Sequence, residues 1–117
     1  GPHPGHLKYK YMYELLCFYV PCPDEPTAQK LIAQLIEAKL IACGNVFSAQ
    51  SSYIWENFFT TEAEFIIFMK TLPSKEQVLE DKILEVHPYE VPCIARWKVS
   101  CNHSYFMWVA NVLTEQL

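Results

Sequence analysis

Two runs of apolar residues stand out in this chain. Residues 65–69 and residues 15–20 lack the alternation of apolar and polar side chains that marks a strand with one wet face. Both runs are short and rich in β-branched or aromatic side chains, so each predicts a strand that is covered on both faces. We expect a first strand over residues 12–20 and a third over 61–71, paired at the centre of one sheet.

A helix is predicted directly after the first strand. Asp24 suits the N-cap position, and apolar residues recur at helical spacing from Ala28 to Ile36. Residues 40–42 extend the same apolar stripe. Gly44 is the expected left-handed stop, because glycine adopts that conformation without steric cost.

A second helix is predicted after the central run. Ser74 and Gln77 have the spacing of a capping box, in which each side chain satisfies an amide at the helix start. Apolar residues at helical spacing follow, and His87 is expected to mark the helix end because Pro88 comes next. Asn102 is a candidate cap for a last, short helix.

Two weaker strands complete the pattern. Residues 46–55 are partly polar and residues 93–99 alternate, so both suit the edges of a sheet. The predicted order is strand, helix, strand, strand, helix, strand and a terminal helix. This is the ferredoxin-like, split βαβ plan, an α+β fold whose antiparallel sheet has the first and third strands at its centre. We assign residues 12–117 to this domain and expect residues 1–11 to be a remnant of a cleaved tag or a disordered terminus.

One face of the predicted sheet lacks a cover. In this plan both main helices lie on the same face, while the central strands are apolar on both. Burying an apolar side chain contributes about 1.5 to 3 kcal/mol, so several of them outweigh the entropy cost of forming a small oligomer. The sequence therefore predicts self-association through the sheet.

Composition narrows the possible partners. The formal net charge is -4 and the nine basic residues are scattered, so nucleic acid is not an expected partner. No apolar run approaches the ~20 residues that cross a bilayer, so we expect no membrane partner and a cytoplasmic location. Five cysteines without a C-x-x-C pair are expected to stay reduced.

The segment 87–92, which contains Pro88 and Pro92, is the most informative candidate for a site. Its prolines force an extended linker, which would hold His87, Tyr89 and Glu90 where a neighbouring subunit or a ligand meets them. The simpler interpretation is a rigid turn with a buried tyrosine and a histidine at a helix end. His87 and Cys93 also permit a nucleophile pair, but nothing places the thiol in an electropositive pocket.

Aromatic residues of the predicted hairpin form a second candidate. Tyr53, Trp55 and Glu56 are expected to line an interface or cleft rather than a platform for base or sugar stacking. The chain contains no dinucleotide, phosphate-loop or zinc-protease motif, so no catalytic residue is assigned.

Six segments of the chain, together with Ala28, resemble the divalent-cation tolerance proteins of the CutA family in order and spacing. They are residues 20–25, 40–46, 52–56, 69–71, 87–92 and 105–109. The resemblance implies a ferredoxin-like fold and a tight homotrimer with its sheets around a threefold axis. It also implies a non-catalytic, cytosolic protein with clefts between subunits and a link to tolerance of copper and other divalent metals.

The resemblance also bears on a metal site. Family members proposed to bind copper have a cysteine in the first strand and two histidines before the Pro-Tyr pair. Val20 and Val86 stand at two of those positions here. A copper site in this chain would therefore rest on His87, with Cys22 or Glu90 joining it across a subunit boundary.

Two other functions stay open. One is a trimeric signalling module similar to the PII proteins, which bind small anionic metabolites in clefts between subunits; the few basic residues of this chain argue against it. The other is a small enzyme that uses Glu90 with His87 as its base, for which the sequence indicates no substrate.

Overall fold

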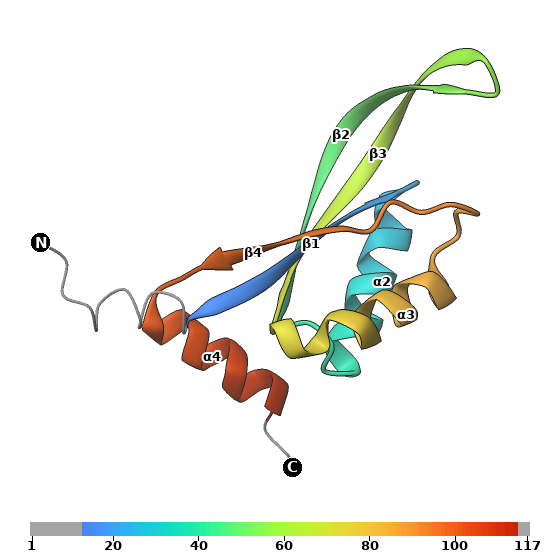
Figure 1. Ribbon diagram of the computed structural model, residues 1–117. Coiled ribbons are helices and arrows are strands. Elements are labelled where there is room, and N and C mark those ends of the chain that lie inside the picture. The colour runs from blue at the N-terminus through green and yellow to red at the C-terminus, as the bar shows by residue number, and fades with distance from the viewer. Residues whose placement is uncertain (1–12, 115–117) are drawn as a thin grey trace, which may run out of the picture.

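The computed structural model describes residues 13–114. Its elements are β1 (Glu14–Cys22), α2 (Glu25–Glu37), β2 (Cys43–Trp55), β3 (Phe58–Thr71), the 3₁₀ turn η1 (Pro73–Lys75), α3 (Glu76–Val86), β4 (Ala95–Ser100) and α4 (His103–Thr114). The strands form one antiparallel sheet in the order β2-β3-β1-β4 (Figure 1). The predicted ferredoxin-like α+β fold, with the first and third strands central, is confirmed. The prediction for residues 1–11 and the first residue of the predicted strand, Met12, lie outside the described residues.

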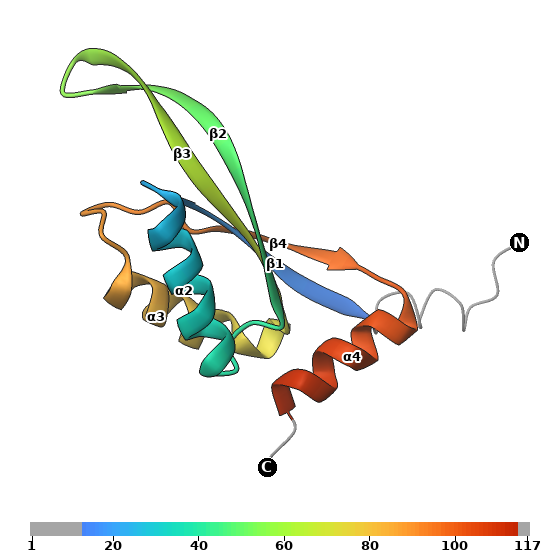
Figure 2. The same cartoon turned by 180° about the vertical axis from the view of Figure 1, so that it is seen from behind.

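Helices α2 and α3 pack side by side on one face of the sheet (Figures 1 and 2). Alternate residues of β1, namely Leu16, Phe18 and Val20, point to this face and join the main apolar core. Ile67 and Met69 of β3 lie opposite Val20 and Phe18 in the register and join the same core. These residues are almost fully buried, and the apolar residues that alternate with them on the other face are buried or half-buried, so neither strand shows polar alternation.

The C-terminal helix α4 covers one end of the opposite face. Leu15 of β1 forms a second buried cluster with Val109 and Leu113 of α4, and Ala42 and Leu72 complete it. Leu15 points away from α2 and α3, because successive side chains of a strand alternate between its faces. The chain therefore supplies a partial second layer, which the sequence did not lead us to expect.

The remainder of this second face is uncovered in a single chain. Its aromatic side chains come one from each strand: Phe47 of β2, Phe68 of β3, Tyr19 of β1 and Trp97 of β4, a set that we call the open face. Phe47 is 47 % exposed and Trp97 is 41 % exposed. The Phe68 and Trp97 rings meet edge to face with centroids 5.3 Å apart. The open face thus carries aromatic side chains from all four strands.

The β2–β3 hairpin extends past the rest of the sheet (Figure 1). Its strands pair as far as Trp55 and Phe58, and the turn between them is Glu56 and Asn57, with φ of 49° and 70°. Positive φ at both central residues matches the two-residue turn that suits the twist of a hairpin. Near this tip Ile54, Phe58 and Phe59 are exposed, so the hairpin presents apolar side chains beyond the core of its own chain.

Helix α2 begins as predicted but ends earlier. Asp24 caps its start by accepting the Thr27 amide proton at 2.8 Å. The left-handed stop is Lys39, with φ of 57°, and not Gly44, which lies in β2. The amides of Lys39 and Leu40 bond the carbonyls of Ile36 and Leu35, which satisfies the helix end.

Gly44 serves close packing instead of a turn. A Cβ atom at this position would lie 3.0 Å from side-chain carbons of Ile32 in α2. Glycine therefore lets the start of β2 approach α2 closely. The sequence pattern did not separate this role from that of a helix stop, because glycine is favoured in both.

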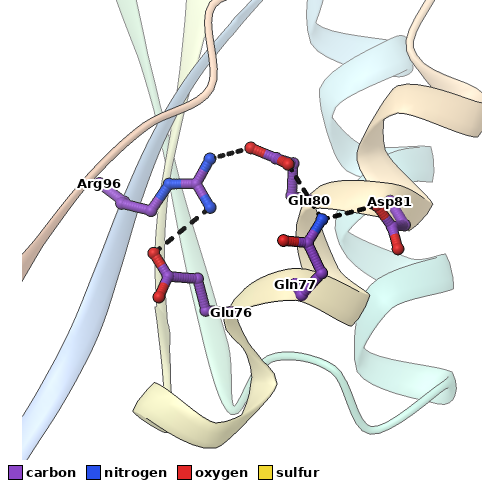
Figure 3. A network of polar contacts seen from close by, with 5 residues as sticks. All are labelled: Glu76, Gln77, Glu80, Asp81 and Arg96. Atoms are coloured by element: carbon purple, nitrogen blue, oxygen red, sulfur yellow. Dashed lines mark hydrogen bonds and ion pairs between the residues drawn. The ribbon is translucent and has the colours of Figure 1, made fainter.

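The predicted capping box of α3 is wrong. Ser74 lies inside η1, and α3 begins at Glu76 without a side-chain cap. Gln77 instead donates to Glu80 and Asp81 on its own helix (Figure 3).

Arg96 of β4 ties this edge strand to α3. It bonds Glu80 and lies 3.5 Å from Glu76 (Figure 3). Its guanidinium also stacks 4.8 Å from the Phe18 ring centroid. The N-terminal half of α3 is therefore held by tertiary ion pairs.

Candidate functional site

A cleft of about 430 Å³ lies where the β2–β3 hairpin faces the linker between α3 and β4. It is lined by Pro21, Tyr53, Trp55, Glu62, Glu64, Tyr89, Glu90, Val91 and Cys93. The volume falls within the range of small-molecule sites. Tyr53, Trp55, Tyr89 and Glu90 were predicted to lie in a cleft, an interface or a site, and the fold brings all four to this one cleft. Glu56, predicted with them, sits in the hairpin turn and does not line it.

A buried carboxylate forms the floor of the cleft. Glu64 of β3 is only 7 % exposed, and it accepts a hydrogen bond from the Tyr89 hydroxyl at 2.8 Å. Burial, followed by the bond to Glu64, raises the pKa of Tyr89 well above its ordinary value. The tyrosine therefore stays a hydrogen-bond donor at any physiological pH.

A second pair of the same kind stands nearer the hairpin tip. The Tyr53 hydroxyl donates to Glu62 at 2.5 Å, and this bond, with a smaller contribution from burial, raises the pKa of Tyr53 to about 12. Glu62 and Glu64 are two residues apart on one strand, so both side chains point to the same face. The cleft therefore has two carboxylates, each oriented by a tyrosine.

His87 fastens the linker that carries Tyr89. Its Nε2 lies 2.8 Å from the Pro21 carbonyl oxygen, and its Nδ1 accepts the Tyr89 amide proton at 3.0 Å. This pattern requires the neutral imidazole with its proton on Nε2. The His87 and Tyr89 rings also pack with centroids 4.8 Å apart. The imidazole is thus a fixed structural element that sets the position of Tyr89.

The three predicted copper ligands do not fit a metal within one chain. Cys22 and His87 are brought together, with Sγ and Nε2 4.0 Å apart, but both ring nitrogens of His87 already bond the backbone. Burial raises the pKa of the Cys22 thiol to about 11, so a metal binding there would have to displace a proton that is held more tightly than in a free thiol. Glu90 is exposed at the cleft. Within residues 13–114 no three His, Cys, Asp or Glu side chains are grouped to hold a metal ion.

Sequence reasoning missed Glu62 and Glu64. The signal was present, because polar residues at every second position from Thr60 to Glu64 precede a continuous apolar run on the same strand. Such a pattern marks the point where one face of a strand stops being covered by apolar packing. What it does not reveal is that Tyr89, 25 residues away from Glu64, would close over it.

Replacing Tyr89 with phenylalanine is expected to destabilise the protein by about 1–3 kcal/mol, because the buried Glu64 carboxylate loses its donor. Urea unfolding followed by circular dichroism measures the loss. Tyr53→Phe is the matched control, since its partner Glu62 is exposed and water replaces the hydroxyl. Equal unfolding midpoints for the two variants would contradict the role assigned to Glu64.

Comparisons with known proteins agree with this architecture. Residues 16–112 match the model of the family described as CutA1 divalent ion tolerance protein. The divalent-cation tolerance protein CutA of Thermococcus kodakarensis is 38 % identical over 101 residues, covering 86 % of this chain and 97 % of that protein. The CutA protein of Pyrococcus horikoshii is 32 % identical over 96 residues, or 81 % and 94 % of the two chains.

Solved structures show the same fold. The CutA1 crystal structure from Ehrlichia chaffeensis superposes with a TM-score of 0.84 at 31 % identity, covering 88 % of this chain and 98 % of that one. The periplasmic divalent cation tolerance protein CutA of Archaeoglobus fulgidus gives 0.82 at 26 % identity, covering 85 % and 98 %. The residues matched by the family model include both main helices, the cleft and nearly all of the sheet. The chain therefore belongs to the CutA1 divalent ion tolerance protein family.

Proposed function

We propose that this protein is a non-catalytic, cytosolic homotrimer that acts in tolerance of divalent metals, copper among them. The observation that carries the proposal is the open face of the sheet in a chain of the CutA1 family. Its aromatic side chains come from four strands; Phe47 and Trp97 are exposed in a single chain, and Tyr19 and Phe68 are half-buried. Apolar surface of this extent on a small domain favours a protein partner.

The hairpin supports assembly with further copies of the same chain. Its exposed tip side chains Ile54, Phe58 and Phe59 lie beyond the core of their own chain, so a neighbouring copy is the surface that they would pack against. Burial contributes about 1.5–3 kcal/mol per large apolar side chain, and the open face and the hairpin together offer enough of them to offset the entropy of association. A ring of three copies follows the family habit that the resemblance implies.

Analytical ultracentrifugation of the purified full chain tests the assembly. We expect a species of three times the chain mass of 13.6 kDa that persists on dilution. A folded species with the mass of one chain at micromolar concentration would refute the trimer. The link to copper is tested separately, by growth in raised copper of a bacterial strain that lacks its own family member, with and without this chain.

The state of His87 supports a non-catalytic role. Both ring nitrogens are engaged with the backbone, so the imidazole has no lone pair available to act as the base of a small enzyme with Glu90. Because both ring nitrogens are engaged, we propose that the link to copper does not depend on direct coordination of the metal by His87. Copper calorimetry on the full chain is expected to show no saturable site that depends on this residue.

The cytosolic location is supported by the cysteines. All five are free thiols, and two of them, Cys17 and Cys22, are buried. No helix within residues 13–114 is long and apolar enough to cross a membrane. The Archaeoglobus fulgidus relative is named periplasmic.

The lining of the cleft disfavours the alternative of a PII-like module. Anionic metabolites need basic side chains or free backbone amides around them. The nine lining residues include three glutamates and no lysine, arginine or histidine.

A further inference from the structure

We infer that the cleft binds an organic cation, an ammonium group carried on a compact apolar body. The inference goes beyond the proposed function, which assigns no ligand to this cleft. It is carried by the cleft's shape, charge and aromatic walls together.

The negative charge of the cleft favours a positively charged ligand. Glu62, Glu64 and Glu90 contribute three carboxylates, and the lining has no basic side chain to balance them. Glu64 is almost fully buried, so water screens it less than it would a surface carboxylate. A cation entering the cleft is attracted, and an anion is repelled.

The carboxylates of β3 are held in place before any ligand arrives. Each accepts one hydroxyl proton, Glu62 from Tyr53 and Glu64 from Tyr89. An ionised carboxylate has about four lone-pair sites, so one tyrosine bond leaves acceptor capacity for an ammonium group. His87 in turn fixes Tyr89 through the backbone, so little conformational entropy is lost on binding.

The walls of the cleft select an organic cation over a metal ion. Tyr53, Trp55 and Tyr89 place three aromatic rings around the carboxylates, and aromatic faces attract ammonium groups. Pro21 and Val91 add apolar surface for a carbon body. The carboxylates are not grouped closely enough to share one metal ion, as no such group occurs among residues 13–114. A ligand that spans about 430 Å³ suits this spacing better than a bare ion.

Calorimetry of the full chain with phenethylamine tests the inference. The matched control ligand is phenethyl alcohol, which has nearly the same shape but no charge at neutral pH. We expect saturable binding of the amine at millimolar concentration, and binding of the alcohol weaker by about tenfold or more, the factor that a lost charged hydrogen bond produces. Manganese chloride serves as the probe for a divalent cation, and we expect no saturable binding.

Variants localise the binding. Glu64→Gln keeps an acceptor for Tyr89 but removes the charge, and should weaken phenethylamine binding about tenfold. Glu62→Gln, at an exposed position, gives the same test without risk to folding. Glu37→Gln removes one negative charge from the exposed end of α2, away from the cleft, and should change the affinity less than twofold.

Three results would overturn the inference: equal affinity for amine and alcohol, equal effects of the cleft and control variants, or saturation by manganese in place of the amine. The absence of any amine binding to the wild-type chain would also overturn it. Ultracentrifugation of the same samples keeps the two proposals apart. A single-copy protein that binds the amine refutes the trimer alone, and a trimer that does not bind it refutes the ligand class alone.

Discussion

Replacing Trp97 with aspartate is expected to convert the proposed trimer into single copies, with about a threefold fall in mass by ultracentrifugation. Trp97 is the β4 member of the open face and packs on Phe68 of β3. A carboxylate at this position would be buried without a partner in the assembly, and an uncompensated buried charge costs about 3–5 kcal/mol per site. Three such penalties in the proposed trimer would all oppose its assembly.

The matched control is Lys98→Asp on the same strand. Lys98 is exposed, and its side chain points to the opposite side of the sheet because neighbours alternate. We expect this variant to keep the wild-type mass although its charge changes by more. If Trp97→Asp also kept the wild-type mass, the open face would not be the interface.

Replacing Phe18 with alanine is expected to lower the free energy of unfolding by about 3–5 kcal/mol, because a fully buried ring is lost and a cavity remains. The residue lies on the central strand β1 in the main core, where its ring also contacts the Arg96 guanidinium. Urea unfolding at one fixed protein concentration measures the effect, since the stability of an oligomer depends on concentration.

Two further variants make the Phe18 prediction specific. Leu84→Ala removes an apolar side chain that is 53 % exposed on α3, and is expected to cost within about 0.5 kcal/mol. Phe18→Leu keeps most of the apolar volume but removes the aromatic ring. Part of its loss in free energy of unfolding therefore measures the contact between the ring and the Arg96 guanidinium. A loss for Phe18→Ala no greater than that for Leu84→Ala would contradict its place in the core.

Local pattern was sufficient for the order and type of the elements. Apolar runs without alternation located the two central strands, and clean alternation located the edge strand β4. Asp24 and His87 were read correctly as the start of α2 and the end of α3, because caps and proline boundaries act over only a few residues. The same local rules failed at Gly44, because glycine suits both a helix stop and a close approach between backbone and side chain. They also failed at Ser74, because a 3₁₀ turn occupies the position where the helix was expected to start.

The chain by itself thus determined the fold class, the central strands and the existence of an apolar face that one copy leaves open, since periodicity and burial are properties of neighbouring residues. Which residues line the cleft was decided by the tertiary structure alone. The bond between Tyr89 and Glu64 joins residues 25 apart, and that between His87 and the Pro21 carbonyl joins residues 66 apart. No local sequence pattern predicts such pairs, because they form only when the linker between α3 and β4 packs against the sheet. That packing made His87 a structural anchor and gathered glutamates and aromatic rings into one acidic site.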